Sequence, residues 1–451
     1  LGVATRIVGI LEPLWLDEIW TILAVERLAS WHEIFTVYRI DNNHPLQSLW
    51  VFFVRSFDNP VLYRVFSALC SLGFLAVATL DCRSGKREAL YFLFLSATSY
   101  VLTLYGTEVR GYGPMICACY FSFLTARRLR DRFSWGYLLL FALSSIVALL
   151  AHFSAVTFIA ALFLWMFGRL SLVQFGGALF APAVATALLW SLFHAGNVVA
   201  GGDVAARVFA SIDLVSVSFG GFELSSGRHL PYSMLVFLIG IVVLSWGMIS
   251  TWRQSRADFW FFLSAIFLFP AILIVVAQPD TVYPRYFLPS LLGALIMLSK
   301  AFSGQENQRL PLLFCSFYFC SNLYLQAQLV AFGRGDYRRV IETVAQEDGN
   351  IIFGQAFRHL LPLKYYGRKA GVTLYVTEGE DFGGAPEYYH LPSRPGPAVW
   401  MLRIVWEEQD RIVQDDGTVF ELLELIPSAP LSGWTTGIYK KRSSRGVREE
   451  K

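Results

Sequence analysis

Residues 231–250 read PYSMLVFLIGIVVLSWGMIS, a run of twenty residues without Asp, Glu, Lys or Arg. About 17–25 predominantly apolar residues in a helix cross the hydrocarbon core of a bilayer, so this run is long enough to span it. The whole chain of 451 residues is 55% hydrophobic and 16% charged. Soluble domains contain about 25% charged residues, so the composition as a whole also indicates a membrane protein.

Comparable apolar runs occur along the first 330 residues. The clearest are 61–80, 89–105, 135–151, 172–193, 259–277 and 310–330, and the shorter ones are 113–126, 153–168 and 286–299. We therefore predict a polytopic α-helical membrane protein with roughly ten spans. Residues 1–10 are too short to span and the chain does not begin with Met, so we expect that a first helix is truncated. Residues 46–57 are also short, and we expect them to lie at the outer interface.

Basic residues at the ends of the apolar runs define the predicted topology. They are Arg83, Lys86, Arg87, Arg127, Arg128, Arg130, Arg132, Arg169, Arg253, Arg256, Lys300 and Arg309. If all are cytoplasmic, as the positive-inside rule requires, several regions lie outside. These regions are 1–60, 106–112, the surroundings of His152, 194–230, 278–285 and everything after about residue 331. Because the basic residues lie at the ends of the apolar runs and determine their orientation, the net charge of +3 does not indicate a nucleic-acid partner.

The last part of the chain, residues 331–451, differs in composition from the rest. Short β-type runs occur at 350–353, 372–376 and 398–405, and helical spacing occurs at 336–346 and 355–366. This pattern predicts a small α/β domain on the outer face. The fold class that we predict is thus a membrane domain over 1–330 with an exported α/β domain over 331–451.

Cysteine usage and glycosylation signals bear on the compartment. All six Cys residues lie in or beside apolar segments, and no CxxC occurs. Buried thiols are therefore expected rather than a redox or metal site. The exported tail has no Cys and the chain has no N-x-S/T sequon. Both absences favour a bacterial origin, so we expect a protein of the inner membrane whose outer regions, as the charge topology defines them, face the periplasm.

Polar residues gather at the outer ends of the predicted spans. The stretches are LWLDEIWT (14–21), DNNHP (41–45), TEVRGY (107–112), His152 and YPRYFLP (283–289). An ionisable residue at the centre of a membrane helix costs about 2.5–3.5 kcal/mol, so such residues are usually paired or functional. Because the topology brings all five stretches to one face, we predict a water-accessible cavity lined by acids, histidine and arginine.

The same stretches resemble the GT-C membrane glycosyltransferases. Within that group they are similar to the branch that contains bacterial relatives of protein O-mannosyltransferases, lipid A aminoarabinose transferase and rhizobial lipopolysaccharide sugar transferases. Relatives in this branch show WLDEA, HPPLY, SQEARMY, THYF and PRYLLP in comparable places. The resemblance covers the membrane region, and the DYR start of the tail (336–338) and its Tyr365–Tyr366 pair also fit.

Three stretches depart from the pattern of the branch. HPPL reads HPLQ here, so one proline is missing. SQEARMY reads GTEVRGY, which keeps Glu108, Arg110 and Tyr112 but lacks the polar Gln. THYF reads AHFS, which keeps His152 without the aromatic-rich neighbours. The acid–base residues are thus retained, whereas the specificity for acceptor or sugar can differ.

The resemblance implies transfer of a sugar, with inversion, from a polyprenyl-phosphate carrier to an acceptor hydroxyl. A hydroxyl is a weak nucleophile at neutral pH, so a positioned carboxylate must accept its proton. Asp17 matches the first-loop Asp of the family and is the expected catalytic base. Neighbouring residues point in different directions, so we expect Glu18 to orient the acceptor or to bond the backbone. The alternative is that both acids cap an interfacial helix.

The departing phosphate needs positive charge rather than a proton donor. Arg285 is the first candidate, because a guanidinium can bind phosphate oxygens in a bidentate manner. Its alternative role is snorkelling at a helix end. Arg110 is the second candidate, unless it pairs with Glu108 and is structural.

The remaining candidates for contact with substrate are His44, Glu108, Tyr112, His152 and Tyr286. A divalent metal is a weaker possibility, with His44, Glu108 and His152 as candidate ligands. Two histidines on separate segments give an incomplete Zn²⁺ site, and a lone His is more often a hydrogen-bonded structural residue. No cofactor is therefore firmly expected.

These inferences predict an enzyme that uses a polyprenyl-phosphate-linked sugar, membrane lipids and an acceptor. The acceptor can be lipid A or lipopolysaccharide, a cell-wall glycan or a protein. The main alternative is a transporter or flippase of lipid-linked sugars, but such proteins often show internal repeats and midplane charges that this sequence lacks. A non-catalytic assembly subunit is a third reading, and the presence of Asp17 argues against it.

Overall fold

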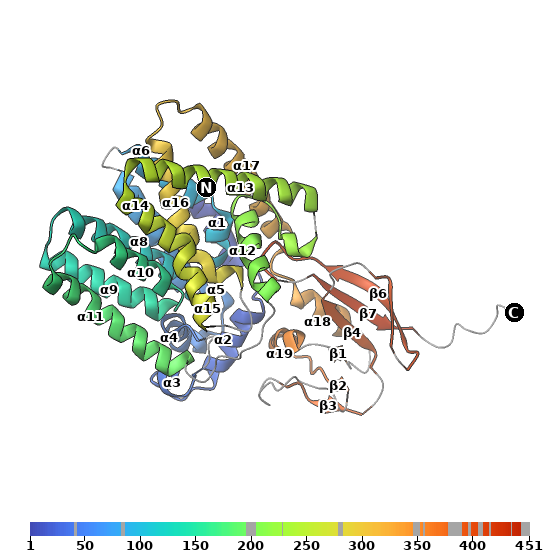
Figure 1. Cartoon of the computed structure of the whole chain (residues 1–451). Helices are drawn as coiled ribbons and strands as arrows, with labels where there is room; N and C mark the ends of the chain where they lie inside the picture. The colour runs from blue at the N-terminus through green and yellow to red at the C-terminus, as the bar shows by residue number, and fades with distance from the viewer. Residues whose placement is uncertain are drawn as a thin grey trace. The chain divides into compact units, whose positions relative to one another are not determined.

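The computed structural model describes the chain except for residues 40–42, 83–85, 195–203, 228, 278–282, 346–351, 355–356, 378–389, 396–397, 405–408, 415, 434 and 443–451. The chain separates into two compact units (Figure 1). The first unit comprises Leu1–Leu11 and Ala24–Ala327, and the second comprises Glu12–Leu23 and Gln328–Lys451. The segment Glu12–Leu23 therefore clusters with the C-terminal part of the chain, although the sequence analysis grouped it with the membrane region.

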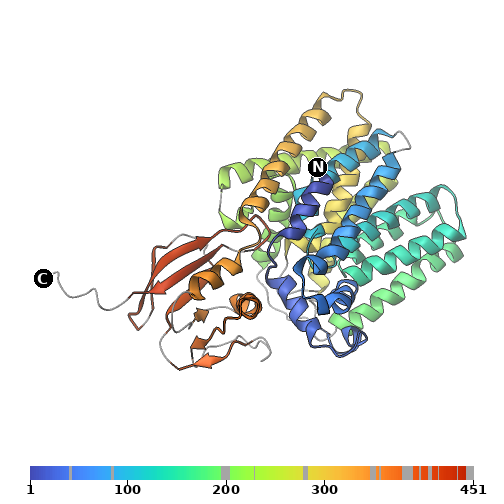
Figure 2. The ribbon, with the colours of Figure 1, turned by 180° about the vertical axis from the view of Figure 1, so that it is seen from behind.

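The first unit is built of helices (Figures 1 and 2). In chain order they are α1 (Gly2–Leu11), the end of α2 (Leu16–Glu26), α3 (Glu33–Thr36), α4 (Pro45–Val54), η1 (Arg55–Phe57), α5 (Pro60–Cys82), α6 (Arg87–Thr98), α7 (Tyr100–Gly106), α8 (Tyr112–Asp131), α9 (Trp135–Ala151), α10 (Ala155–Met166), α11 (Leu172–Leu189), η2 (Trp190–His194), α12 (Val204–Ser218), η3 (Leu224–Ser226), α13 (Leu230–Gln254), α14 (Arg256–Leu263), η4 (Ser264–Leu268), α15 (Phe269–Ala277), η5 (Pro284–Phe287), α16 (Leu288–Ser303) and α17 (Arg309–Phe332).

Among the described residues, four helices are long and apolar enough to cross a membrane. They are Pro60–Cys82, Leu172–Phe193, Leu230–Gln254 and Pro284–Ser303. A fifth span results if α6 and α7, which meet at a bend of 62°, are taken together. The prediction of a helical protein with membrane-spanning segments is confirmed at this level. By length and composition, the described helices account for four or five of the roughly ten predicted spans.

The other predicted spans form helices that are short, interrupted or rich in polar residues. The helices α9 and α10 have 17 and 12 residues. The run 259–277 is interrupted by the π-helical turn η4. The last turns of α8 contain Arg128, Arg130 and Asp131. An apolar run in the sequence thus predicts burial better than it predicts one straight span, because residues packed between helices are as apolar as residues facing lipid.

The polar residues of α17 bond to the bent pair α6–α7. The Asn322 side-chain oxygen accepts a hydrogen bond from the Tyr100 backbone N–H at 2.8 Å, directly after the break. The Gln326 amide donates to the Thr103 hydroxyl at 3.1 Å. At the break itself, the Ser99 hydroxyl accepts from the backbone N–H of Leu102 and caps α7. The bonds to the N–H groups of Tyr100 and Leu102 satisfy backbone groups that an interrupted helix would otherwise leave unpaired.

An ionic cluster joins α8, α14 and α16. The Asp258 carboxylate accepts hydrogen bonds from Arg130 Nη1 at 3.3 Å and from Trp165 Nε1 at 2.8 Å, and it pairs with Lys300. The Arg130 guanidinium lies over the Trp165 ring, 4.1 Å from its centroid. One carboxylate on α14 thus ties together the helices α8, α10 and α16.

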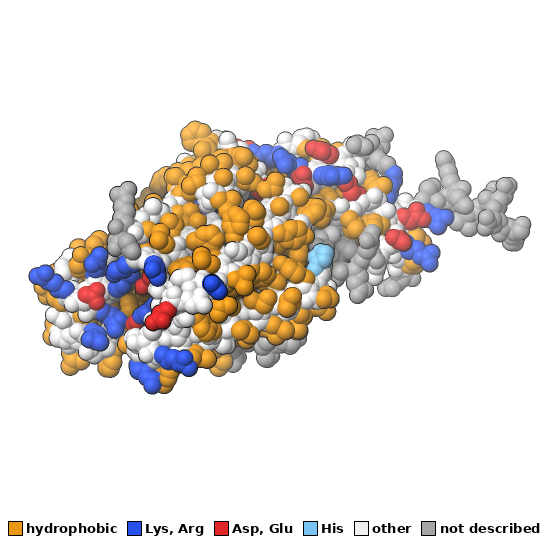
Figure 3. Space-filling model, turned by 90° about the horizontal axis from the view of Figure 1, so that it is seen from above, with side chains coloured by type: hydrophobic (Ala, Val, Ile, Leu, Met, Phe, Trp, Pro, Cys, Tyr) orange, Lys and Arg blue, Asp and Glu red, His pale blue; other side chains and the backbone are white. Residues whose placement is uncertain are grey.

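Large apolar side chains are exposed on the surface of the first unit. On α13 they include Leu235, Leu238, Ile241, Val242 and Ile249. Figure 3 shows one face of the molecule, on which hydrophobic side chains cover a broad area while Lys and Arg side chains gather toward one end. A soluble monomer rarely exposes such a continuous apolar surface, and contact with lipid acyl chains explains it.

The described part of the second unit combines the start of α2 and two further helices with a five-stranded and a two-stranded sheet. The two further helices are α18 (Tyr337–Ala345) and α19 (Phe357–Ala370). They agree with the helices that the spacing of apolar residues predicts at 336–346 and 355–366. The strands are β1 (Ile352–Gly354), β2 (Val376–Thr377), β3 (Ser393–Arg394), β4 (Trp400–Ile404), β5 (Arg411–Val413), β6 (Val419–Ile426) and β7 (Thr436–Lys441).

The larger sheet has the strand order β1-β4-β7-β6-β5. β1 pairs with β4 in parallel, and the other neighbours are antiparallel. Met401, Ile412, Phe420 and Tyr439 form a buried core between strands β4 to β7. The sequence predicts β4 and, in part, β1 and β2. It does not predict β5, β6 and β7, because in them charged and apolar residues follow one another without strict alternation.

We expect the substitution Asp258→Asn to lower the free energy of unfolding by about 2 kcal/mol, because hydrogen bonds to charged groups contribute about 1.5–3 kcal/mol. Thermal unfolding of the purified protein in detergent measures the change. Asp131→Asn is the matched control, since Asp131 is exposed at the end of α8. Equal unfolding temperatures for the two variants would show that the cluster does not stabilise the first unit.

Candidate functional site

The residues of four predicted stretches lie at the ends of helices in the first unit. His44 directly precedes α4, whose first residue is Pro45, and the fixed φ of proline suits the start of a helix. The TEVRGY stretch connects α7 to α8, and His152 follows the last residue of α9. Arg285 and Tyr286 lie in η5. Asp41 and Asn42 of the DNNHP stretch lie outside the described residues.

Four aromatic rings from these segments form a cluster, which we call the His–Tyr cluster: His44, Tyr112, His152 and Tyr286. The imidazoles of His44 and His152 are stacked, with centroids 4.7 Å apart and planes at 20°. The ring of Tyr112 lies 4.8 Å from His152 and 5.7 Å from His44. Tyr286 contacts His152 at 5.9 Å. Segments more than 240 residues apart in the chain therefore meet at one place.

The backbone of Gly111 makes this meeting possible. A Cβ atom at Gly111 would lie 1.7 Å from the carbonyl oxygen of Ala151 and 3.3 Å from the Cβ of His44. No side chain fits there, so the turn before α8 can approach the end of α9 closely only with glycine. Gly113 is similarly restricted, because its Cβ would lie 2.4 Å from the carbonyl oxygen of Ser67 on α5.

Hydrogen bonds fix the two imidazoles. The backbone N–H of Ser154 donates to His152 Nδ1 at 3.1 Å, so the proton of a neutral His152 ring is on Nε2. His44 forms a hydrogen bond to the backbone of Ala151. Its Nε2 atom is buried and has no hydrogen-bond partner among the described residues. Both side chains are buried, with exposed fractions of 3% for His44 and 8% for His152.

Two buried arginines accompany the cluster. The exposed fractions are 2% for Arg110 and 8% for Arg285. The Arg285 guanidinium lies over the Tyr283 ring at 4.0 Å from its centroid, and the Arg110 guanidinium lies 5.9 Å from the centroid of Tyr112. Contact with an aromatic face helps to hold a guanidinium in place.

The electrostatic surroundings keep His44 neutral. Burial lowers its pKa well below the usual value, and electrostatic interactions with Arg110, His152 and Arg285 lower that pKa further. The hydrogen bond to Ala151 opposes the shift only in part. At neutral pH His44 is therefore an uncharged imidazole that can accept or donate a hydrogen bond.

Glu108 contributes a carboxylate and Tyr105 contributes a hydroxyl near the cluster. Glu108 is fully buried, and its carboxylate lies within electrostatic range of the Tyr105 hydroxyl, as does Arg285. The ring of Tyr105 packs edge-on against Tyr112 at 5.3 Å. A cavity of about 10 Å³ lies beside Tyr105 and Tyr112, which is room for about one water molecule.

Asp17 and Glu18 lie in the first turn of α2 and belong to the second unit. The Glu18 carboxylate accepts a hydrogen bond from the backbone N–H of Trp15 at 3.1 Å. This bond from the third helical residue back to the cap position is half of a capping box, so Glu18 bonds the backbone, one of the two roles expected for it. The Asp17 carbonyl accepts from the Thr21 hydroxyl at 3.1 Å, and the Asp17 side chain is 7% exposed.

The LWLDEIW segment is anchored by α19. The Tyr366 hydroxyl donates to the Leu14 backbone carbonyl at 2.8 Å, although the two residues are 352 positions apart. Gly333, just after α17, packs so closely on Glu12 that a Cβ there would lie 2.8 Å from a Glu12 carboxylate oxygen. The Tyr365–Tyr366 pair and the end of α17 thus hold the segment that begins α2.

The structure does not support a metal centre among the predicted ligands. No group of three or more His, Cys, Asp or Glu side chains in the described part of the chain is arranged to hold a metal ion. The stacking of His44 on His152 also directs the two rings face to face, whereas ligands of one ion approach it along the ring edges. The candidate set of His44, Glu108 and His152 is therefore better described as a hydrogen-bonding and aromatic cluster.

Some residues that contact the predicted ones were not expected from the sequence. Tyr105, Tyr283 and Tyr366 were not singled out as site residues. Tyr283 could have been found, because it directly precedes PRYFLP. The role of Gly111 is visible only in space, since the sequence does not show which backbone it contacts.

A comparison of the sequence with protein-family models finds no match, and a comparison with curated proteins finds none either. The function must therefore be argued from the site itself.

We expect Gly111→Ala to destabilise the first unit by about 3 kcal/mol or more, because overpacking against backbone cannot be relieved by rotating a side chain. Thermal unfolding in detergent measures this loss. Gly176→Ala on α11 is the matched control, since a Cβ there meets no atom within 4 Å and alanine favours the helix. An unchanged unfolding temperature for Gly111→Ala would contradict the close packing of α8 and α9.

Proposed function

We propose that this protein is an inverting membrane glycosyltransferase of GT-C type. It transfers a sugar from a polyprenyl-phosphate-linked donor to an acceptor hydroxyl at the outer face of a bacterial inner membrane. The C-terminal α/β region lies on the same outer side. The observation that carries the proposal is the His–Tyr cluster with two buried arginines, because it joins four of the five stretches in which the sequence resembles these enzymes.

The two arginines are suited to the donor phosphate. Arg285 and Arg110 are both buried and both within electrostatic range of His44. A phosphate that contacts two guanidiniums gains charge-assisted hydrogen bonds that are stronger in a site with little water. Neutral His44 adds no competing charge, and its buried Nε2 can accept a hydrogen bond from a sugar hydroxyl. Arg285 and Arg110 would hold the phosphate as it departs.

Asp17 is the proposed catalytic base. The acceptor oxygen attacks the anomeric carbon while the bond from that carbon to the phosphate oxygen breaks. The hydroxyl proton passes to the Asp17 carboxylate, and the polyprenyl phosphate leaves with the bonding electrons. A single displacement of this kind inverts the anomeric configuration. Glu18 fixes the first turn of α2 and thereby positions Asp17.

One observation favours the alternative function of a transporter or flippase of lipid-linked sugars. The helices α6 and α7 meet at a bend of 62°, and a π-helical turn precedes α15. Broken helices of this kind are common in transporters. A transporter would move the lipid-linked sugar across the bilayer without cleaving it. The chemical fate of the donor therefore separates the two functions.

We expect Asp17→Asn to reduce sugar transfer at least a hundredfold, because general base catalysis contributes about 10²–10⁴ in rate. Purified protein in proteoliposomes is assayed for release of polyprenyl phosphate from a polyprenyl-phosphate-linked sugar, and donor binding is measured in parallel. Donor binding should stay within about twofold, because the base acts on the acceptor.

The matched control is Asp416→Asn, since Asp416 is an exposed Asp of the same unit. Unchanged transfer by Asp17→Asn would refute the base. Movement of intact donor across the bilayer without cleavage by the wild-type protein would favour the transporter.

A further inference from the structure

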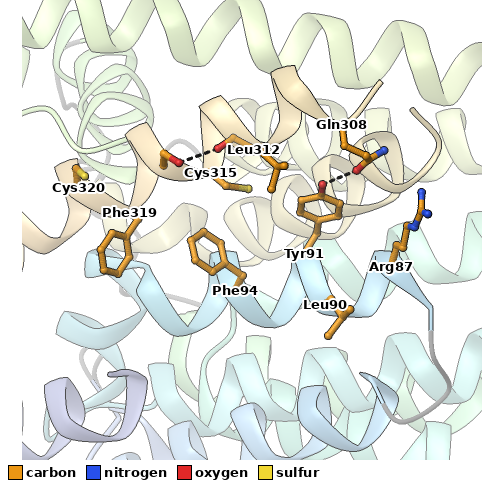
Figure 4. Close-up of a pocket in the computed structure, with 10 residues that line it drawn as sticks. Arg87, Leu90, Tyr91, Phe94, Gln308, Leu312, Cys315, Phe319 and Cys320 are labelled. Carbon is orange, nitrogen blue, oxygen red and sulfur yellow. Dashed lines mark hydrogen bonds between the residues drawn. The ribbon is translucent and has the colours of Figure 1, made fainter. Parts of the chain in front are cut away.

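A groove runs between α6 and α17 in the first unit, apart from the His–Tyr cluster. It has a volume of about 730 Å³, within the range of 300–1,000 Å³ that ligand sites usually have. Figure 4 shows the side chains that line it. They are Arg87, Leu90, Tyr91, Phe94, Gln308, Leu312, Cys315, Ser316, Phe319 and Cys320.

The two ends of the groove differ in chemistry. At one end Arg87, the first residue of α6, lies beside Tyr91 and Gln308 (Figure 4). The Tyr91 hydroxyl donates to the Gln308 side-chain oxygen at 2.6 Å. Toward the other end the walls are formed by Phe94 and Phe319 (Figure 4). The groove is thus amphipathic along its length, with a cation and polar groups at one end and aromatic rings toward the other.

Arg87 is free to bind an anion. Its side chain is exposed, and it forms no ion pair or hydrogen bond with any described side chain. Lys86 caps the same helix, and Arg309 begins α17 next to Gln308, so further positive charge is close in sequence to this end. The positive-inside rule assigns all three residues to the cytoplasmic side.

The apolar walls are open to their surroundings. Leu90 and Leu312 on the rim have exposed fractions of 56% and 57%. In a bilayer such a surface contacts acyl chains, whereas a polar or soluble ligand would leave it unsatisfied. The occupant that matches both ends therefore has an anionic head group and a long apolar chain.

We propose that the groove binds an anionic diacyl phospholipid of the cytoplasmic leaflet. The head-group phosphate lies at Arg87, and one acyl chain lies along Phe94 and Phe319. Basic residues at the cytoplasmic ends of membrane helices bind such head groups by charge, with about 1 kcal/mol for each Lys or Arg. This site is distinct from the proposed donor site, because the positive-inside rule assigns Arg87 to the side of the membrane opposite the His–Tyr cluster.

Native mass spectrometry of the purified full chain in detergent tests the proposal. Phosphatidylglycerol or phosphatidylethanolamine is added, and the dissociation constant of the first bound lipid is measured for each. We expect phosphatidylglycerol to bind more tightly, and Arg87→Gln to weaken its binding about fivefold without affecting phosphatidylethanolamine. Arg253→Gln is the matched control, because Arg253 is an exposed arginine near the end of α13 that lines no part of the groove. It should change neither constant.

A second variant tests the apolar part of the groove. Leu312→Trp adds volume on the rim, and we expect it to weaken phosphatidylglycerol binding while the unfolding temperature in lipid-free detergent stays unchanged. Equal binding of the two lipids, or equal phosphatidylglycerol binding by wild type and Arg87→Gln, would overturn the proposal. Displacement of phosphatidylglycerol from this site by equimolar polyprenyl phosphate would also overturn it, since the groove would then belong to the donor.

Discussion

The close approach of the Gly111 backbone to the carbonyl of Ala151 is the contact on which the site depends. It brings the start of α8 against the end of α9 and leaves no room for a side chain between them. As a result, the ring of His152 stacks on His44 and packs against Tyr112. Interiors are packed too densely to absorb an extra methyl group at such a point, so the geometry of the cluster is set by backbone rather than by adjustable side chains.

The packing has an electrostatic consequence. Arg110 and Arg285 are buried beside His44, and together with burial they lower its pKa so that the imidazole stays neutral. Burial of positive charge is costly in a medium of low polarity, and an anionic ligand reduces that cost. Two buried arginines beside a neutral histidine therefore support the proposal that this site binds a phosphate group.

The sequence predicts the class of fold and the location of the polar motifs, but not their spatial arrangement. Long apolar runs such as 231–250 form single helices, whereas 89–105 breaks at Ser99 and 259–277 contains a π-helical turn, because polar contacts such as that of Asn322 with Tyr100 compensate for the break. The tail helices are predicted well, since their apolar residues recur at helical spacing. Strands β5 to β7 are not predicted, since cross-strand pairing between distant residues defines them. The hydrogen bond from Tyr366 to Leu14 is likewise a long-range contact that no local pattern reveals.

The central claim is that the buried arginines bind the phosphate of a polyprenyl-linked donor. The most direct measurement is the dissociation constant of polyprenyl phosphate for the purified protein in detergent, for the wild type and for Arg285→Gln. Removal of a charge-assisted, desolvated contact costs about 1.5–3 kcal/mol, so the account predicts binding weakened at least tenfold. Equal affinity of the two proteins, with both folded to the same extent, would contradict the claim.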